Sequence, residues 1–188
     1  MLAIALLYFY ATSFKRMALV GNFIVSLLSA LSLIMVLIYE PHLYDLARPG
    51  DYYVAGICTR FILSLAVFAF ATTMIREIIK DMEDVEGDAA HGASTMPVKW
   101  GMGVSRIVTL ICIAATIGAL VYLLMQVLDK EVAAFVIYTA VMASCLFAVA
   151  VWLTFARTKS QLHKISNFMK LIMLIGLLIL PIYYLIQF

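Results

Sequence analysis

The chain has 188 residues, of which 65% are hydrophobic and only 13% are charged. So few polar residues cannot cover the surface of a soluble globule, and the composition therefore predicts a protein of the lipid bilayer. The net charge of +2 comes without any long basic run, which gives no case for nucleic-acid binding. The three cysteines form no CxxC pair and are interpreted as small apolar residues.

The first element is a short apolar run, MLAIALLYFYATSF, which precedes Lys15 and Arg16. As a helix it would reach about 21 Å, whereas the hydrocarbon core of a bilayer is roughly 30 Å thick. It does not resemble a signal peptide, because the basic residues come after the apolar part. We interpret it as the rear part of a helix that begins further upstream.

Five longer apolar stretches come next, each close to the ~20 residues that a membrane-spanning helix needs. Their apolar residues are continuous and do not alternate with polar ones, which favours helices over the strands of a barrel. The predicted spans are Met17–Tyr39, Val54–Ile75, Val104–Leu128, Val132–Ala156 and Ile165–Phe188. We therefore expect an all-α, polytopic transmembrane helix bundle with about five full spans plus a partial N-terminal helix, in a single domain over residues 1–188.

Positive charge is distributed unequally between the two sets of helix ends. Ten of the thirteen lysines and arginines flank one set of ends, and the remaining three lie on the opposite side: Arg48, Arg60 and Lys130. Cytoplasmic loops carry the excess of basic residues. We therefore expect an integral protein of the cell (inner) membrane, with residues 76–101 in the cytoplasm.

The segment 76–101, REIIKDMEDVEGDAAHGASTMPVKWG, holds six of the eleven acidic residues. If the preceding helix continues through it, one helix face carries four carboxylates: Glu77, Asp81, Asp84 and Asp88. Like charges at this spacing repel, so a cation between them is expected. Hard carboxylate oxygens with room for water suit Mg²⁺. The alternative is a solvated loop without bound metal.

This segment resembles the second aspartate-rich motif of the UbiA superfamily of intramembrane prenyltransferases, KDxxDxxGD followed by GxxT and a closing glycine. The order of the apolar stretches is similar to helices four to nine of that nine-helix fold. The chain would then be the C-terminal two-thirds of such a domain, with 76–101 as its cytoplasmic aspartate-rich segment.

The resemblance implies Mg²⁺-dependent transfer of a polyprenyl group from its diphosphate to an acceptor at the membrane. The form REIIKDxEDxxGD is most similar to branches that attach a geranylgeranyl group to geranylgeranylglyceryl phosphate, or that prenylate quinone precursors of the 4-hydroxybenzoate or dihydroxynaphthoate type. Both acceptors remain open. The implied partners are thus a polyprenyl diphosphate, a lipid or aromatic acceptor and membrane lipids; no protein partner is indicated.

The resemblance also implies roles for individual residues. The expected catalytic and metal-binding carboxylates are Asp81, Asp84 and Asp88. Arg76 and Lys80, near the same helix end, are candidates to bind phosphate oxygens. Tyr10 and Lys15 resemble a substrate-binding tyrosine and lysine of the family.

One departure from the family concerns its first aspartate motif, NDxxDxxxD. No such pattern occurs in this sequence, and Asn22 is followed by FIVS. We therefore expect a longer enzyme of which this chain alone is inactive. A membrane transport or assembly subunit is the competing hypothesis, but a transporter predicts acidic groups at mid-membrane depth, and the five predicted spans contain no Asp or Glu.

Overall fold

The computed structural model describes residues 17–39, 51–125 and 133–187. The short apolar run at the start of the chain, with Tyr10 and Lys15, lies outside the described residues, as do the two loops at 40–50 and 126–132.

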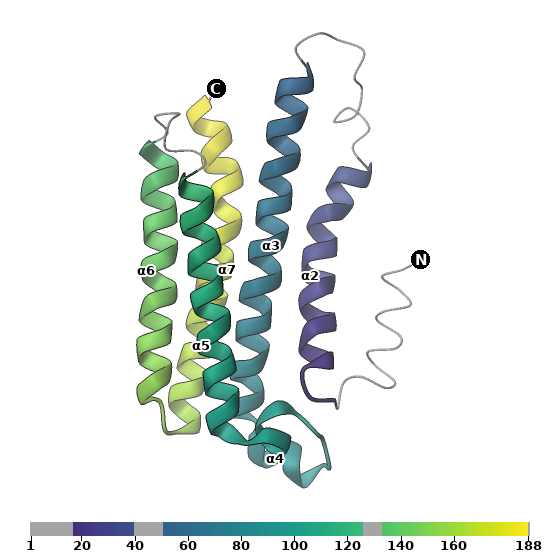
Figure 1. Ribbon diagram of the computed structural model, residues 1–188, viewed down its shortest axis with the longest axis vertical. Coiled ribbons are helices and arrows are strands. Elements are labelled where there is room, and N and C mark those ends of the chain that lie inside the picture. Colours follow the sequence, from purple (N-terminus) through teal and green to yellow (C-terminus); the bar gives the residue numbers. More distant parts are fainter. Residues whose placement is uncertain (1–16, 40–50, 126–132, 188) are drawn as a thin grey trace.

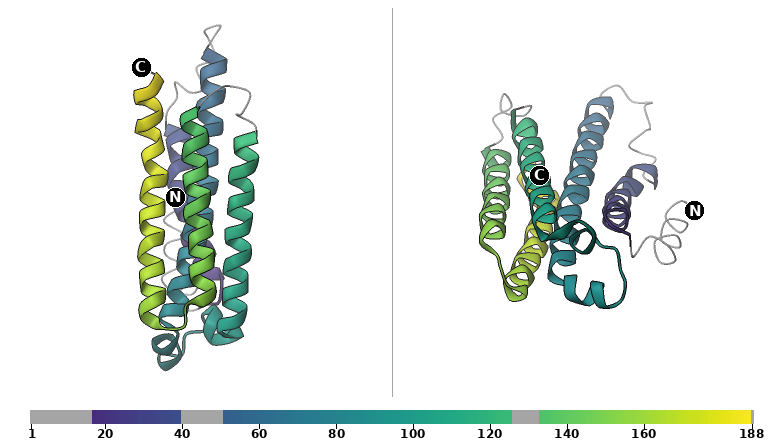
Figure 2. Two further views of the ribbon diagram at one scale, coloured as in Figure 1. Left: turned by 90° about the vertical axis from the view of Figure 1, so that its left-hand side faces the viewer. Right: turned by 60° about the horizontal axis from the view of Figure 1, so that its bottom comes forward.

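Long helices dominate the described part of the chain (Figure 1). They are α2 (Val20–Tyr39), α3 (Asp51–Glu83), α4 (Val85–Ala90), α5 (Met96–Met125), α6 (Ala133–Phe155) and α7 (Lys159–Gln187). All except α4 run up and down along one direction, side by side (Figure 2). Within the described ranges the only β-type pairing recorded is an isolated bridge between Met17 and Ser94. The predicted all-α bundle is confirmed.

Helix α3 is the centre of the bundle, because it packs against α2, α5 and α7, while α6 packs against α5 and α7. The last turns of α3 carry an apolar stripe at spacings of three and four residues, which places its members on one helix face. All four are at most 1% exposed: Ile75, Ile78, Ile79 and Met82. They join Ile113 of α5 and Met169 of α7 in one buried cluster.

Four of the helices are long and apolar enough to cross a membrane: Val20–Tyr39, Thr59–Glu83, Met96–Met125 and Val136–Phe155. They correspond to the first four predicted spans. The fifth predicted span coincides with α7 as far as Gln187, its last residue, Phe188, being outside the described residues. The 29 residues of α7 give about 43 Å of helix. Helix α3 runs on to Glu83, eight residues beyond the predicted end of its span at Ile75.

One end of the bundle collects the start of α2, the end of α3, α4, the start of α5, the end of α6 and the start of α7 (Figure 1). We call it the aspartate end, because residues 76–101 lie there. Helix α5 is interrupted there at Gly101 (φ 86°, ψ 162°), which separates its first turn from the long remainder. Basic residues predicted to share one side of the membrane also belong to these segments, among them Lys80, Lys99 and Lys159.

Helices α3 and α7 approach closely at Gly176. A Cβ atom on Gly176 would lie 2.6 Å from Cε1 of Phe68, closer than side chains tolerate. The Gly176 carbonyl also accepts a hydrogen bond from the Tyr138 hydroxyl at 3.1 Å, which ties α6 to the same place. The absence of a side chain at 176 therefore sets the separation of the two helices.

We predict that Gly176→Ala lowers the thermal unfolding midpoint of the detergent-purified protein. Overpacking of this kind typically costs about 1–3 kcal/mol. Gly118→Ala is the matched control, because nothing lies within 4 Å of its Cβ position. Both substitutions gain the helix propensity of alanine, so only the clash distinguishes them. Equal midpoints for the two variants would contradict this account of the α3–α7 contact.

Candidate functional site

The acidic segment does not form one continuous helix. Helix α3 ends at Glu83, and Asp84 (φ −97°, ψ 8°) stands at the junction with the six-residue helix α4. Glu77 and Asp81 thus lie on α3, whereas Asp88 lies on α4. The sequence interpretation of four carboxylates on a single helix face is therefore wrong. Asp84 and Gly87 both have low helix propensity, which agrees with a break at this point.

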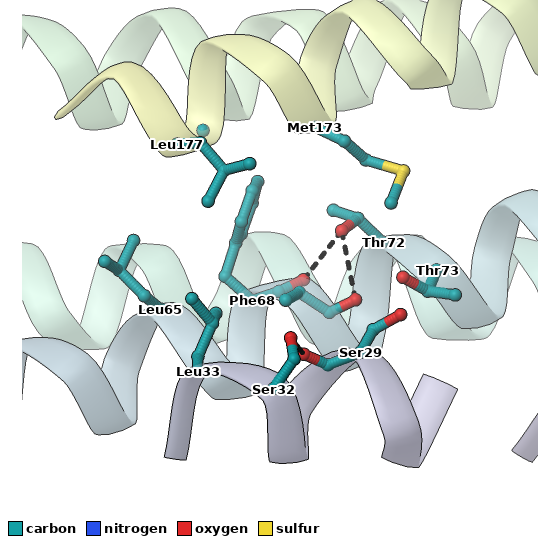
Figure 3. Close-up of a pocket in the computed structure, with 11 residues that line it drawn as sticks. Ser29, Ser32, Leu33, Leu65, Phe68, Thr72, Thr73, Met173 and Leu177 are labelled. Atoms are coloured by element: carbon teal, nitrogen blue, oxygen red, sulfur yellow. Dashed lines mark hydrogen bonds between the residues drawn. The ribbon is translucent and has the colours of Figure 1, made fainter. Parts of the chain in front are cut away.

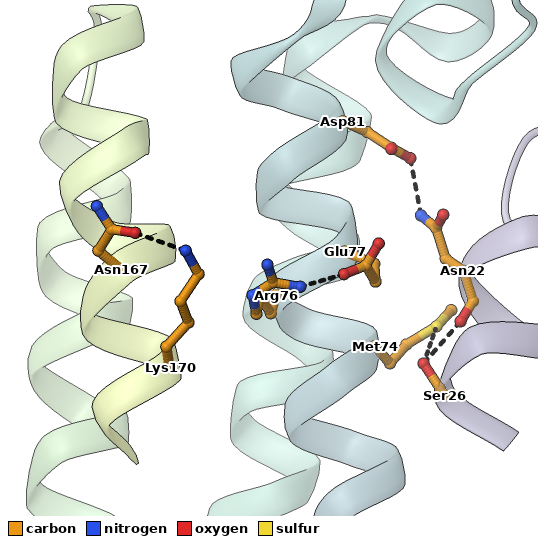
Figure 4. A network of polar contacts seen from close by, with 8 residues as sticks. All are labelled: Asn22, Ser26, Met74, Arg76, Glu77, Asp81, Asn167 and Lys170. Atoms are coloured by element: carbon orange, nitrogen blue, oxygen red, sulfur yellow. Dashed lines mark hydrogen bonds and ion pairs between the residues drawn. The ribbon is translucent and has the colours of Figure 1, made fainter. Parts of the chain in front are cut away.

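Asp81 is held by a residue from a different helix. The side-chain amide of Asn22, in the first turn of α2, donates a hydrogen bond to Oδ2 of Asp81 at 2.8 Å (Figure 4). Asn22 is itself 8% exposed, and its backbone carbonyl accepts a hydrogen bond from Ser26. An amide buried within a spanning helix needs such a partner, because an unpaired polar group there is costly.

The charged neighbours of Asp81 come from both sides of the helix break. The carboxylates of Asp88 and Glu77 repel that of Asp81, and Lys80 attracts it. Asp81 is half-buried, which adds to the free-energy cost of its negative charge. The folded chain therefore concentrates negative charge around Asp81 with Lys80 as the compensating cation, and a bound cation would relieve this repulsion.

Asp88 is positioned by the loop after α4. Gly92 adopts φ +68°, a conformation that glycine reaches without strain, and the chain reverses there. The returning segment brings Thr95 back, so that its hydroxyl donates a hydrogen bond to Oδ2 of Asp88 at 3.0 Å. This pair explains the GxxT pattern physically. None of the residues of α4 is buried, so Asp88 is positioned by these contacts and not by core packing.

The intervening carboxylates, Glu83 and Asp84, face α7. Oε1 of Glu83 lies 2.7 Å from Nδ1 of His163, and Oδ1 of Asp84 lies 3.7 Å from Nζ of Lys159. The structure therefore leaves Asp88 within electrostatic range of Asp81 and directs Asp84 towards α7. The side chains of Asp84 and Lys159 are 44% and 66% exposed, so their ion pair contributes little stability.

The predicted phosphate-binding residues are placed differently from one another. Arg76 pairs with the adjacent Glu77, and its Nε atom is buried without a hydrogen-bond partner in the described part of the chain. Lys80 is exposed. The bridge from Met17 to Ser94 holds the chain that precedes α2 against the loop after α4.

The donor set around Asp81 suits Mg²⁺ better than a softer metal. Magnesium typically takes one or two carboxylates and keeps water or phosphate oxygens as its other ligands. Asp81 and Asp88 offer two carboxylates close enough to repel each other. Among the described residues no group of three His, Cys, Asp or Glu side chains forms a ready metal cluster. Two carboxylates alone are a partial ligand set for such an ion.

A pocket of about 220 Å³ lies between α2, α3 and α7 (Figure 3). Four hydroxyls line part of it, from Ser29, Ser32, Thr72 and Thr73, and the remainder includes Leu33, Leu65, Phe68 and Leu177. Thr72 is nine residues before Asp81 on α3, about 13 Å along the helix axis. The pocket therefore lies deeper in the bundle than the aspartates and is mainly apolar at its far end.

The sequence interpretation gave no role to three residues of the site: Asn22, His163 and Thr95, of which Thr95 appeared only as the last position of the GxxT pattern. Asn22 does not match the first aspartate motif, so no role was expected for it. Its signal was its location, because an amide in an otherwise apolar span needs a polar partner. Nothing in the sequence indicated that this partner would be Asp81, 59 residues away.

We predict that Asn22→Ala lowers the stability of the detergent-purified protein by about 1–3 kcal/mol, because Asp81 loses its donor inside the bundle. In a double-mutant cycle the effects of Asn22→Ala and Asp81→Ala should not add, since either change removes the same contact. Ser32→Ala, which removes only a bond to the Ser29 carbonyl, should change stability by at most about 0.5 kcal/mol. Additive effects across the cycle would refute a coupling between α2 and Asp81.

Comparison with known proteins identifies several relatives. Digeranylgeranylglyceryl phosphate synthase of Methanothermobacter thermautotrophicus is 36% identical over 121 residues, which cover 63% of this chain and 37% of the relative. The enzyme of that name from Methanosphaera stadtmanae is 29% identical over 182 residues, covering 91% of this chain and 56% of the relative. The chain therefore spans little more than half the length of such relatives.

A solved structure described as digeranylgeranylglyceryl phosphate synthase in membranes has the same fold. It aligns with a TM-score of 0.66 at 23% identity, over 94% of this chain and 57% of that one. The sequence profile of the UbiA prenyltransferase family matches residues 1–184. With a match across nearly its whole length, the chain belongs to the UbiA prenyltransferase family.

Proposed function

We propose that the protein takes part in the Mg²⁺-dependent transfer of a geranylgeranyl group from its diphosphate to a glycerophosphate lipid acceptor. The observation that carries the proposal is the pair of neighbouring carboxylates, Asp81 and Asp88, at the end of a membrane-spanning helix with a mainly apolar pocket deeper in the bundle. Relatives named digeranylgeranylglyceryl phosphate synthase support this choice of substrates.

The physical basis is that a prenyl diphosphate has two parts with opposite solvent preferences. Its apolar chain is stabilised in the pocket between α2, α3 and α7, away from water. Its diphosphate stays at the aspartate end, where Asp81 and Asp88 would hold Mg²⁺; Asp84 remains the third ligand proposed from the motif. The ion would supply charge neutralisation of the departing diphosphate.

The protein groups have separate tasks in this proposal. Asn22 and Thr95 orient the carboxylates of Asp81 and Asp88 through the hydrogen bonds described above. Lys80 binds diphosphate oxygens from the same helix end, and Lys15 and Tyr10 are proposed to assist from the segment that precedes Met17. Arg76, on the flank of α3 next to α7, is proposed to bind phosphate oxygens of a substrate from that side. Negative charge that develops on the leaving group is thereby met by fixed positive groups, the usual source of catalytic stabilisation.

The alternatives receive less support. An aromatic quinone precursor as acceptor remains chemically compatible with the carboxylate pair, but the relatives described above are named for a glycerophosphate lipid. The hypothesis of a transport or assembly subunit does not explain why the chain belongs to a prenyltransferase family.

We predict that Asp81→Asn and Asp88→Asn each reduce prenyl transfer by at least about 10²-fold, because each removes a charge that holds the metal at the leaving group. The assay uses membranes from cells that express the complete gene, supplied with Mg²⁺, geranylgeranyl diphosphate and geranylgeranylglyceryl phosphate. Transfer should also stop when EDTA removes the metal.

Glu86→Gln provides the control for this prediction, since it removes an exposed carboxylate of the same segment. It should retain transfer close to that of the parent. If Asp81→Asn and Asp88→Asn also turned over like the parent, the acidic segment would serve only solvation and the proposed function would be wrong.

We further propose that the aspartate end faces the cytoplasm, as the distribution of basic residues indicates. An impermeant thiol reagent added to intact cells should leave Ala90→Cys unlabelled and should label Asp45→Cys. The parent protein, with its three cysteines, gives the background. The reverse pattern, with Ala90→Cys labelled before permeabilisation, would place the aspartates outside.

A further inference from the structure

The contact between Glu83 and His163 shows which residues of α3 and α7 lie at the same level of the bundle. The two helices run in opposite directions, so moving back along α3 and forward along α7 leads to the same level of the bundle (Figure 1). Arg76 lies seven residues from Glu83, and Lys170 lies seven residues from His163. Seven residues make about two helical turns and about 10 Å. Arg76 and Lys170 therefore stand at one level, each on the helix face that carries the contact.

A line of polar side chains runs along α7 from this contact to Lys170. Nδ2 of Asn167 lies 3.0 Å from Nε2 of His163. Nζ of Lys170 donates a hydrogen bond to Oδ1 of Asn167 at 2.9 Å, as Figure 4 shows. With His163 bonded to Glu83, the chain of contacts orients the Lys170 ammonium from the side of α7 that meets α3.

At the level of Arg76 and Lys170, the interface between α3 and α7, called the seam below, carries more positive than negative charge. Arg76 has one carboxylate partner, Glu77, and its buried Nε has no hydrogen-bond partner among the described residues. The contact recorded for Lys170 is to a neutral amide. Arg76 has a single carboxylate partner and the partner of Lys170 is neutral, so positive charge at this level is incompletely compensated, which favours the binding of an additional anion.

The pair lies near the predicted boundary between the hydrocarbon core and the headgroup region. Arg76 directly follows Ile75, the predicted end of the span on α3, and Lys170 lies five residues after Ile165, the predicted start of the span on α7. The pair also differs in direction from the carboxylate site. Five residues separate Arg76 from Asp81, about 140° around the helix, and Asp81 faces α2 while Arg76 lies on the α7 side.

We propose that Arg76 and Lys170, across the seam between α3 and α7, bind the phosphate monoester of the lipid acceptor. This inference rests on the proposed function, and it assigns the acceptor to a different face of α3 from the diphosphate of the donor. The two substrates would then converge on the aspartate end from the two sides of one helix, with like-charged headgroups held apart.

The test measures binding to the purified protein in a non-ionic detergent, by thermal shift or thermophoresis. The probe is 1-O-octadecylglycerol 3-phosphate, with 1-O-octadecylglycerol as its phosphate-free counterpart. We expect the parent to prefer the phosphate probe, and Lys170→Met to weaken its binding about tenfold or more, because a charge-assisted hydrogen bond is lost. Lys170→Arg should retain most of the affinity.

Lys164→Met is the matched control, because it removes one lysine from the same helix at an exposed position. It should bind the probe like the parent. The unfolding midpoint of each variant without ligand separates a loss of binding from a loss of fold. A tenfold loss in Lys170→Met alone, with an unchanged midpoint, supports the assignment.

Three results would overturn the assignment. In the first, Lys170→Met binds the phosphate probe as tightly as Lys164→Met does. The Lys170 side chain would then only extend towards the membrane surface. In the second, Lys170→Met weakens the binding of geranylgeranyl diphosphate with Mg²⁺ but not the binding of the monophosphate probe. The seam would then bind the donor. In the third, inorganic phosphate or a two-chain phosphatidic acid competes as well as the probe, which indicates a general anion or bulk-lipid site. The proposed function is judged separately, by Mg²⁺-dependent transfer in the Asp81 and Asp88 variants.

Discussion

Burial of the apolar stripe at the end of α3 is the constraint on which the site depends. Ile75, Ile78, Ile79 and Met82 are withdrawn into the core with α5 and α7. Once these positions face inwards, the 3.6-residue period of the helix determines the directions in which the intervening charged side chains point. Glu77 and Asp81 must emerge on the side of α2, and Arg76 and Glu83 on the flank next to α7. Packing therefore determines where the electrostatic groups can act.

Tertiary contacts then join short segments that would not hold their geometry alone. Asn22 connects α2 to Asp81, and Thr95 connects the loop before α5 to Asp88. The bridge from Met17 to Ser94 adds a backbone link between these same two regions. The carboxylate pair is thus assembled from elements that are far apart in sequence, around an end of α3 that the core has already oriented.

The sequence predicted the helices and the location of the acidic segment because continuous apolar runs and clustered charge are local properties. The break at Asp84 could have been anticipated from low helix propensity, but the spacing of the carboxylates by four, three and four residues indicated a continuous helix more strongly. The partners of Asp81 and Glu83 could not be predicted, since Asn22 and His163 reach them only after the helices pack in a particular register. Tyr10 and Lys15 remain predictions, because they lie outside the described residues.

Helix α4 carries Asp88 but has no buried core of its own. Its six residues contribute nothing to the buried cluster. Its backbone amides are therefore protected from solvent exchange only by the hydrogen bonds of the short helix itself and by the contacts at its two ends. Such a segment opens at a lower free energy than the bundle that carries it. Its order therefore depends on a few polar contacts at its ends, among them the hydrogen bond from Thr95 to Asp88.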